Sequence, residues 1–495
     1  MFLQFSAAIY FLLLLTVAET ATKLQAQGSN TQSGPNIVFI LADDLGYGGV
    51  GYNNPEMATP WLDALSMDGV RLDAFYAHSL CSPTRASLLT GRYSYKLLNH
   101  NYLVSQAWGV DVAYTMLPAT LRDAGYRTHM VGKWHQGFYK VDLLPTRRGF
   151  DTFFGFLTGD ADKNSQEVNE FECSWGHPVA LTDGELPAVG LNGTSYTDEA
   201  FAQRAVDLIS SHDFSSAPVF LLVALSNPHS PFEAPPTAKA ETPFEIYRAM
   251  VGSVDDAVGR IVDALHSKEV MDNTLLIFAS DNGAAIHSYG TNSPLRGSKC
   301  SNWEGGIRVP AFVAGGFLPE TARGRTLDGM ISVADWYATL AGLAGTTVDH
   351  SGPARSDSID QWRYISGQSL RSSRKQIVHE HNFTEGGTAE GALRVGKWKL
   401  LVGLQDRAEL YNNSLYEGDI DISACADAPC LFDIEADPTE SQNIASEYPK
   451  IVEGLLLLFE EIGQEYHAPL EDDFLDDDSS CAAWQQAGGF VTPWK

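Results

Sequence analysis

The residues best suited to chemistry lie in the stretch from Leu80 to Arg92, which reads LCSPTRASLLTGR. Cys81, Pro83 and Arg85 form a C-x-P-x-R pattern within it. Pro83 is expected just inside the start of a helix, where its missing N–H costs nothing, so Cys81 would lie at the helix N-terminus. Free backbone N–H groups and the helix dipole favour an oxyanion such as sulfate there. The alternative is a buried structural cysteine before an amphipathic helix.

Four other polar clusters each follow a short apolar run that reads as a strand. The four runs and the residues that follow them are Asn36–Leu41 with Asp43 and Asp44, Thr128–Val131 with Lys133 and His135, Pro218–Leu225 with Asn227 and His229, and Thr274–Ala279 with Asp281 and Asn282. Ligands bind outside the carboxyl ends of parallel strands, so this pattern predicts one site at one edge of a mostly parallel sheet. Taken singly, the aspartate pair is typical of a solvated turn and each histidine of a structural position.

Helices are expected between these strands. Residues Met116–Ala124 end at Gly125, and the apolar residues between Ile246 and Leu265 repeat at helical spacing, which predicts a crossover helix with one buried face. From about Ser372 short strand-like pieces such as Gln376–His379 and Trp398–Val402 precede a helical run, Ile451–Ile462. This change indicates a smaller α+β C-terminal subdomain.

The segment around Cys81 resembles the signature of the type I sulfatases, in which the cysteine is oxidised after synthesis to formylglycine, an aldehyde. Within that family the chain is most similar to the arylsulfatase B group, the N-acetylgalactosamine-4-sulfatases. The likeness runs from about Asn36 to the C-terminus and is carried by PTRRGFDTFFGF, LRGSKCSNWEGGIR, KWKLL and LFDIEADPTE, at residues 145–156, 295–308, 397–401 and 431–440. The resemblance implies an alkaline phosphatase-like α/β fold, a mostly parallel sheet sandwiched by helices.

The resemblance also implies roles for individual residues. Formylglycine at Cys81 would be hydrated to a geminal diol that attacks sulfur, and Arg85 would steady the deprotonated diol. Lys133 and Lys299 would bind the sulfate oxygens; His135 would act as base toward the diol and His229, with Lys299, as acid toward the leaving oxygen. One calcium ion is implied, with hard oxygen ligands supplied by Asp43, Asp44, Asp281, Asn282 and the converted Cys81.

The composition of the chain limits the kinds of molecule that it is expected to bind. The chain of 495 residues has 33 Lys and Arg against 62 Asp and Glu, a formal charge of -29, which argues against nucleic acid as a partner. An anionic substrate would therefore need a local basic pocket in an acidic surface.

The six cysteines contain no C-x-x-C pair, which makes a cysteine zinc site unexpected. Cys425 and Cys430 are close enough to pair, whereas pairing among Cys173, Cys300 and Cys481 stays open and leaves at least one odd thiol.

The N-terminus predicts entry into the secretory pathway. Ala7–Ala18 form an apolar run too short to span a bilayer, which is typical of a signal peptide, and no later segment is apolar enough for a membrane helix. Sequons at Asn192, Asn382 and Asn412 are compatible with N-glycosylation. The expected organisation is a signal peptide over 1–26, a linker over 27–35, a catalytic domain over 36–371 and the C-terminal subdomain over 372–495. The expected location is extracellular or lysosomal.

These observations favour a calcium-dependent sulfatase acting on a sulfate ester of a carbohydrate, or on an aryl sulfate, after maturation by a formylglycine-generating enzyme. One alternative is a catalytically inactive protein that binds sulfated glycans, with Cys81 unmodified. Another is a phosphomonoester or phosphonate hydrolase of the same fold. Such hydrolases usually carry two or three metal ions, whereas the sequence offers one cluster of metal ligands and places lysines where further ions would bind.

Overall fold

The computed structural model describes residues 34–97, 101–169, 171–285, 289–383, 389–405, 425–464, 477 and 479–495. From Pro35 onward the chain forms one compact unit. The expected signal peptide, most of the expected linker and the sequon at Asn412 lie outside the described residues. Among the residues that are described, no helix combines the length and apolar character that crossing a membrane requires.

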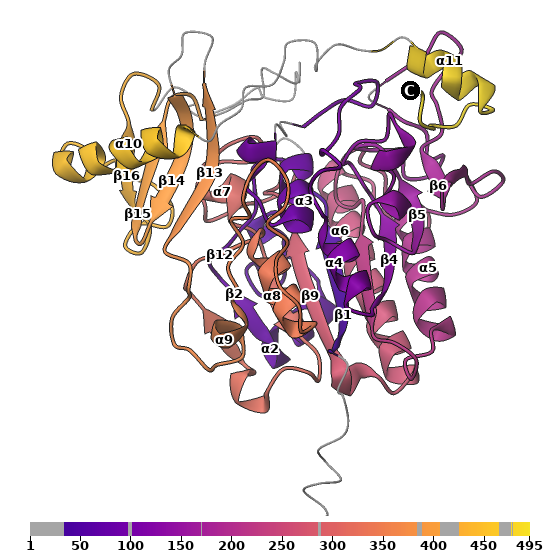
Figure 1. Ribbon diagram of the computed structural model, residues 1–495, viewed down its shortest axis with the longest axis horizontal. Coiled ribbons are helices and arrows are strands. Elements are labelled where there is room, and N and C mark those ends of the chain that lie inside the picture. The colour runs from indigo at the N-terminus through magenta and orange to yellow at the C-terminus, as the bar shows by residue number, and fades with distance from the viewer. Residues whose placement is uncertain are drawn as a thin grey trace, which may run out of the picture. The chain divides into compact units, whose positions relative to one another are not determined.

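A large central sheet organises the described part of the chain (Figure 1). Its ten strands are, in spatial order, β11 (Arg325–Leu327), β2 (Val70–Leu72), β10 (Ala311–Ala314), β9 (Thr274–Ser280), β1 (Asn36–Ala42), β8 (Val219–Ala224), β4 (Arg127–Gly132), β5 (Thr152–Phe156), β6 (Leu181–Asp183) and β7 (Leu186–Pro187). Strands β9, β1, β8, β4 and β5 run parallel to one another, whereas β10, β6 and β7 pair with their neighbours in antiparallel fashion. The predicted mostly parallel α/β sheet is confirmed.

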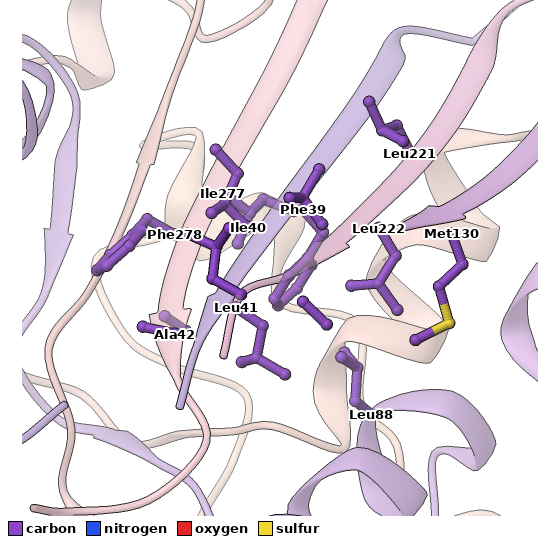
Figure 2. Close-up of a cluster of buried hydrophobic side chains, with 14 of the residues drawn as sticks. Phe39, Ile40, Leu41, Ala42, Leu88, Met130, Leu221, Leu222, Ile277 and Phe278 are labelled. Atoms are coloured by element: carbon purple, nitrogen blue, oxygen red, sulfur yellow. The ribbon is translucent and has the colours of Figure 1, made fainter. Parts of the chain in front are cut away.

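The central strands form because their sequences are apolar on both faces. Every residue of β1, β8 and β9 is buried, as expected for parallel strands with helices on both sides. Figure 2 shows side chains of this core, where Phe39 and Leu41 of β1 lie among residues of β8, β9 and β4 and near Leu88 of a covering helix. Burial of this continuous apolar core is the main stabilising contribution to the fold.

Helices cover both faces of the sheet (Figure 1). Helix α5 (Thr197–Ser211) packs on α6 (Pro243–Ser267), which also contacts α2 (Pro60–Asp68), whereas α3 (Cys81–Thr90), α4 (Leu117–Asp123) and α8 (Asp335–Leu343) pack against one another. The crossover helix α6 begins with a complete capping box between Thr242 and Glu245 and buries one face, as its periodicity predicts. The shorter helices are α7 (Glu304–Ile307), α9 (Trp362–Ile365) and α11 (Ser479–Gln486), and a two-stranded sheet pairs β12 (Ile331–Ser332) with β3 (Phe75–Tyr76).

A second, smaller sheet follows in the chain. It is antiparallel and consists of β13 (Gln376–Phe383), β14 (Ala389–Val395), β15 (Trp398–Val402) and β16 (Cys430–Asp433), with α10 (Pro449–Gly463) packed on it. The predicted small C-terminal sheet with a helix is therefore present, while the domain boundary at residue 372 stays a prediction.

Two disulfides join cysteines whose pairing the sequence left partly open. Cys425 pairs with Cys430, as their proximity suggested, and Cys173 pairs with Cys481 across 308 residues. Cys81 and Cys300 are in neither disulfide. The long-range disulfide joins α11 to the 171–177 segment, and the C-terminus then reaches the loop that follows β4, where the backbone N–H of Trp494 donates to the carbonyl of Tyr139 at 3.0 Å.

Loss of the long-range disulfide should lower stability more than loss of the short one. Replacing Cys173 and Cys481 by serine should cost about 2–5 kcal/mol of unfolding free energy, because the closed loop restricts the unfolded chain and this effect grows with loop length. The matched control, serine at Cys425 and Cys430, opens a disulfide with a sequence separation of only 5 and should cost less. Denaturant unfolding of both variants under non-reducing conditions measures the difference, and equal losses would contradict the expectation.

Candidate active site

The ends of four neighbouring strands meet at one edge of the sheet, at the same level. Ala42 of β1 pairs in register with Ser280 of β9, and Ala224 of β8 pairs with both Leu41 of β1 and Gly132 of β4. The residues that follow these strands are therefore neighbours in space. The polar clusters that the sequence predicts on one edge do share it.

Gly132 is needed for this arrangement at the end of β4. Its φ is +109°, and a Cβ atom there would lie 1.8 Å from the carbonyl oxygen of Ala224, so no other residue fits. The backbone turns at this point, and the next residue, Lys133, donates its backbone N–H to the same Ala224 carbonyl at 2.9 Å. The turn directs the buried Lys133 side chain to Asp43.

Helix α3 brings Cys81 to this edge as its first residue, as predicted. Thr84 fixes the helix N-terminus, because its hydroxyl accepts the backbone N–H of His78 at 2.8 Å and donates to the carbonyl of Asp281 at 2.5 Å. The Cys81 thiol donates to Asp43 Oδ1 at 3.4 Å. Burial, together with the carboxylate of Asp281, raises the pKa of this thiol well above its ordinary value. The unmodified side chain is therefore a protonated thiol and a weak nucleophile.

Three carboxylates are each paired with a cation. Lys133 Nζ lies 2.7 Å from Asp43 Oδ2, Lys299 Nζ lies 2.8 Å from Asp44 Oδ1, and Arg85 Nη2 lies 2.7 Å from Asp281 Oδ2. Burial would raise the pKa of Asp43 and Asp44, but Lys133 and Lys299 outweigh it and lower both values. Asp281 differs, because burial and the neighbouring Asp43 raise its pKa to about 7. The solvated-turn interpretation of the aspartate pair is wrong, since both side chains are buried.

The same residues fit a hard divalent cation. Ligand atoms of Asp43, Asp44, Cys81 and His229 all lie within 4.8 Å of one another. Asn282 donates its amide N–H to Asp44 Oδ1 at 2.7 Å, while its Oδ1 is buried without a hydrogen-bond partner in the described structure. Oxygen ligands of this kind are those that calcium prefers. Calcium does not favour sulfur ligands, so the unmodified Cys81 thiol fits this set less well than the oxygen atoms do.

His135 is held in one tautomer by a contact that the sequence did not predict. Its Nε2 donates to the backbone carbonyl of Tyr102 at 3.2 Å, which leaves Nδ1 as the unprotonated nitrogen. In the described part of the chain this buried Nδ1 has no hydrogen-bond partner. Burial and the charges of Lys133 and Arg85 lower the pKa of His135 well below its ordinary value. A neutral imidazole with a buried lone pair is suited to accept a proton.

His229 faces the cluster from the end of β8. Its Nδ1 donates to the carbonyl of Ser230 at 2.7 Å, and its Nε2 lies 3.8 Å from Asp44 Oδ2. Burial and the charge of Lys299 lower its pKa to about 3. His229 therefore borders the aspartate cluster, and His135 follows the adjacent strand, β4, two residues after Lys133.

The second sheet contributes an ionic network behind the Lys299 loop that sequence reasoning missed. Lys399 of β15 is fully buried, with Nζ 2.9 Å from Glu304 Oε1 and 2.7 Å from Glu440 Oε1. Glu440 also accepts the backbone N–H of Glu304 at 2.6 Å. Because the three residues are far apart in sequence, no local pattern could have revealed them.

Several predicted positions lie outside this cluster or outside the described structure. Asn192 is on a surface loop, the side chain of Asn382 is among those not described, and Asn412 lies in an undescribed segment. Two aromatic residues with side chains of a kind that can contact sugars, Trp303 and His381, are both fully buried, Trp303 beneath the guanidinium of Arg296 and His381 against Phe459. They are core residues and not sugar contacts.

Comparison with known proteins gives consistent matches along the chain. The family model described as Sulfatase matches residues 35–346. Arylsulfatase J of Mus musculus is 35% identical over 466 residues, which covers 87% of this chain and 76% of the relative. N-acetylgalactosamine-6-sulfatase of Sus scrofa is 34% identical over 330 residues, which covers 63% of this chain and 62% of the relative.

Solved structures share the fold. The crystal structure of Ps i-CgsB in complex with k-i-k-neocarrahexaose has a TM-score of 0.73 and 26% identity, covering 92% of this chain and 98% of that one. The phosphonate monoester hydrolase of Agrobacterium radiobacter has a TM-score of 0.55 at 18% identity, covering 87% of this chain and 96% of that one. The second likeness shows the fold alone, so the fold does not separate sulfate from phosphonate chemistry.

Proposed function

The chain belongs to the sulfatase family, and from this premise we propose that it hydrolyses a sulfate ester of a carbohydrate with formylglycine derived from Cys81 and one calcium ion. The observation that carries the proposal is the approach of Cys81 to Asp43, Asp44 and His229, whose ligand atoms all lie within 4.8 Å of one another. The contacts of Lys133 and Arg85 with Asp43, and of Lys299 and Asn282 with Asp44, support the proposal.

The proposal gives formylglycine and calcium separate chemical roles. Formylglycine, when hydrated, supplies two hydroxyl groups on one carbon, one to attack sulfur and one whose deprotonation releases sulfate. Asp43, Asp44, Asp281 and Asn282 would hold calcium, which supplies Lewis-acid polarisation of a sulfate oxygen. The buried, unpartnered Oδ1 of Asn282 supports this assignment.

Cationic side chains bind the sulfate group. Lys133 pairs with Asp43 and Lys299 pairs with Asp44. Arg85 lies 3.7 Å from Asp43 Oδ1. They present fixed positive charge where negative charge develops on the sulfate oxygens during displacement. Such preorganised charge tends to be the largest contribution to catalysis, because it acts in a buried site without reorganisation.

The two histidines move the protons. His135 accepts a proton at Nδ1 from the hydroxyl that expels sulfate. His229 donates a proton from Nε2 to the sugar oxygen as its bond to sulfur breaks, with Lys299 assisting. Because Nδ1 already carries a proton for the Ser230 carbonyl, this step uses the doubly protonated imidazolium, which an anionic sulfate ester bound beside it would favour. Each transfer is worth about 10²–10⁴-fold in rate when the group is correctly placed.

A carbohydrate substrate is supported by the relatives. Among them are N-acetylgalactosamine-6-sulfatases, and one neighbour of similar structure was solved with a neocarrahexaose. The sequence likeness to the 4-sulfatase group makes the 4-sulfate of galactosamine the other first candidate. Maturation would require a formylglycine-generating enzyme, and an extracellular or lysosomal location remains part of the proposal.

Release of free sulfate tests the substrate class. Protein produced with a formylglycine-generating enzyme should release sulfate from a galactosamine oligosaccharide sulfated at position 4 or 6, with 4-nitrophenyl sulfate as an unspecific comparison. Cys81→Ala is the inactive control for each substrate. Release from the aryl sulfate alone would retain the mechanism and move the substrate to another sulfated glycan, whereas faster hydrolysis of a phosphonate monoester would contradict the proposal.

A further inference from the structure

The turn that carries His229 is held by a buried carboxylate outside the catalytic cluster. Asp198, in the first turn of α5, accepts the backbone N–H and the hydroxyl of Ser226, both at 2.9 Å, and the backbone N–H of Asn227 at 3.1 Å. Its side chain is 1% exposed. One carboxylate thus fixes two consecutive residues between β8 and His229.

A buried lysine binds the same turn at a backbone carbonyl. Lys163 donates from Nζ to the carbonyl of Ser226 at 2.9 Å and is also 1% exposed. Its own carbonyl accepts the backbone N–H of Thr197 at 2.8 Å and the Thr197 hydroxyl at 2.9 Å. Lys163 is therefore joined both to the turn and to the residue that precedes Asp198.

The turn is also joined directly to the aspartate pair. The carbonyl of Asn227 accepts the backbone N–H of Asp43 at 3.1 Å, and the Asn227 amide donates to Tyr196 at 2.8 Å and to Ser253 at 2.6 Å. Any shift of the turn would therefore move His229 relative to Asp44, whose Oδ2 lies 3.8 Å from His229 Nε2.

We propose that Asp198 and Lys163 are positioning residues that fix the turn 226–229 and thereby aim His229 Nε2 at the leaving oxygen. The inference rests on the proposed function, because it gives His229 the role of acid. Burying a carboxylate and an ammonium group costs several kcal/mol each unless their hydrogen bonds are satisfied. Neutral side chains would be enough to hydrogen-bond an ordinary turn. The use of two charged side chains, Asp198 and Lys163, is explained if the turn 226–229 must be held rigidly by strong hydrogen bonds.

Leaving-group dependence distinguishes positioning from a general loss of structure. Asp198→Asn keeps the size of the side chain but replaces an acceptor oxygen with an N–H₂ donor that faces backbone N–H groups. We expect kcat on a sulfated sugar to fall about 10–100-fold, the scale of a small misplacement of a reacting group. Turnover of 4-nitrophenyl sulfate should change by less than about threefold, because nitrophenolate departs without a proton.

Three further variants sharpen the test. Lys163→Met should likewise lose more activity on the sulfated sugar than on the aryl sulfate. If Asp198→Asn does not fold, Lys163→Met alone tests the inference. Asp198→Asn should add no loss to His229→Ala, since residues that act through one group are not additive. Asp255→Asn is the matched control, because Asp255 is a buried carboxylate that also accepts two backbone N–H groups, from Trp61 at 3.2 Å and Leu62 at 2.8 Å. It should change stability without leaving-group preference.

An activity-independent measurement separates this inference from the proposed function. The imidazole ¹⁵N spectrum of His229 should show one tautomer, protonated at Nδ1, in the wild type and in Asp255→Asn, and averaged signals in Asp198→Asn. An unchanged His229 signal, equal losses on both sulfates, or additivity with His229→Ala would each overturn the inference. Wild-type protein that releases no sulfate from any substrate would overturn the proposed function instead, and the spectrum would still decide the role of Asp198.

Discussion

Replacing Cys81 by serine should abolish turnover while the protein remains folded. Serine fits the position, which is 2% exposed at the start of α3, and its hydroxyl can still reach sulfur. It lacks the second hydroxyl on the same carbon, so a sulfate ester on serine has no route to collapse without attack of water on sulfur. We expect kcat to fall by at least about 10⁴-fold, the scale seen when a covalent nucleophile is removed.

Mass spectrometry provides a second test of this prediction. Peptides that contain residue 81 should carry a carbonyl in active wild-type protein and one added SO₃ group in Cys81→Ser after exposure to substrate. Cys81→Ala should carry neither. Wild-type protein from its natural source with an intact Cys81 thiol, yet full activity, would contradict the formylglycine mechanism, and the same thiol with no activity would favour an inactive glycan-binding protein.

Chelation of divalent ions should lower kcat/KM by about 10³-fold, because Lewis-acid polarisation of a transferring group is worth several kcal/mol. Calcium should restore the activity. The expected stoichiometry is one ion per chain, since the described residues contain one cluster of three or more side chains able to hold a metal. Two ions per chain would favour the phosphomonoester or phosphonate hydrolase instead.

A matched pair of asparagine variants tests the ligand set without reference to activity. Asn282→Ala removes the buried, unpartnered Oδ1 beside Asp44 and should weaken calcium binding measured by calorimetry. Asn36→Ala changes a buried asparagine at the opposite end of β1 and should leave calcium affinity unchanged. Equal affinity in the two variants would remove Asn282 from the ligand set.

The strands and their order along the chain could be predicted because local composition decides them. Apart from their first residues, the runs before Asp43 and Asp281 are almost wholly apolar, so each was expected to lie inside a parallel sheet covered on both faces. The spacing of apolar residues in α6 likewise determined its buried face. These properties depend on neighbours in sequence, and the structure reproduces them within a few residues.

Contacts between residues far apart in the chain could not be predicted from the sequence. The pairing of Cys173 with Cys481 and the burial of Lys399 between Glu304 and Glu440 join residues far apart in the chain. Local sequence did not distinguish Trp303, a core residue, from a surface aromatic that could contact a sugar. Asp198 reads as an ordinary acidic residue in the first turn of a helix, although it binds the turn before His229.

By itself, the sequence determined the chemical groups and the edge of the sheet on which they gather, because residue type and strand periodicity are local properties. The tertiary structure alone decided how those groups are paired. Lys133 binds Asp43, Lys299 binds Asp44, and each histidine is held in one tautomer by a backbone carbonyl, of Tyr102 or of Ser230. These pairings depend on the in-register ends of β9, β1, β8 and β4 and on exclusion of water, which strengthens charge interactions that solvent would otherwise screen.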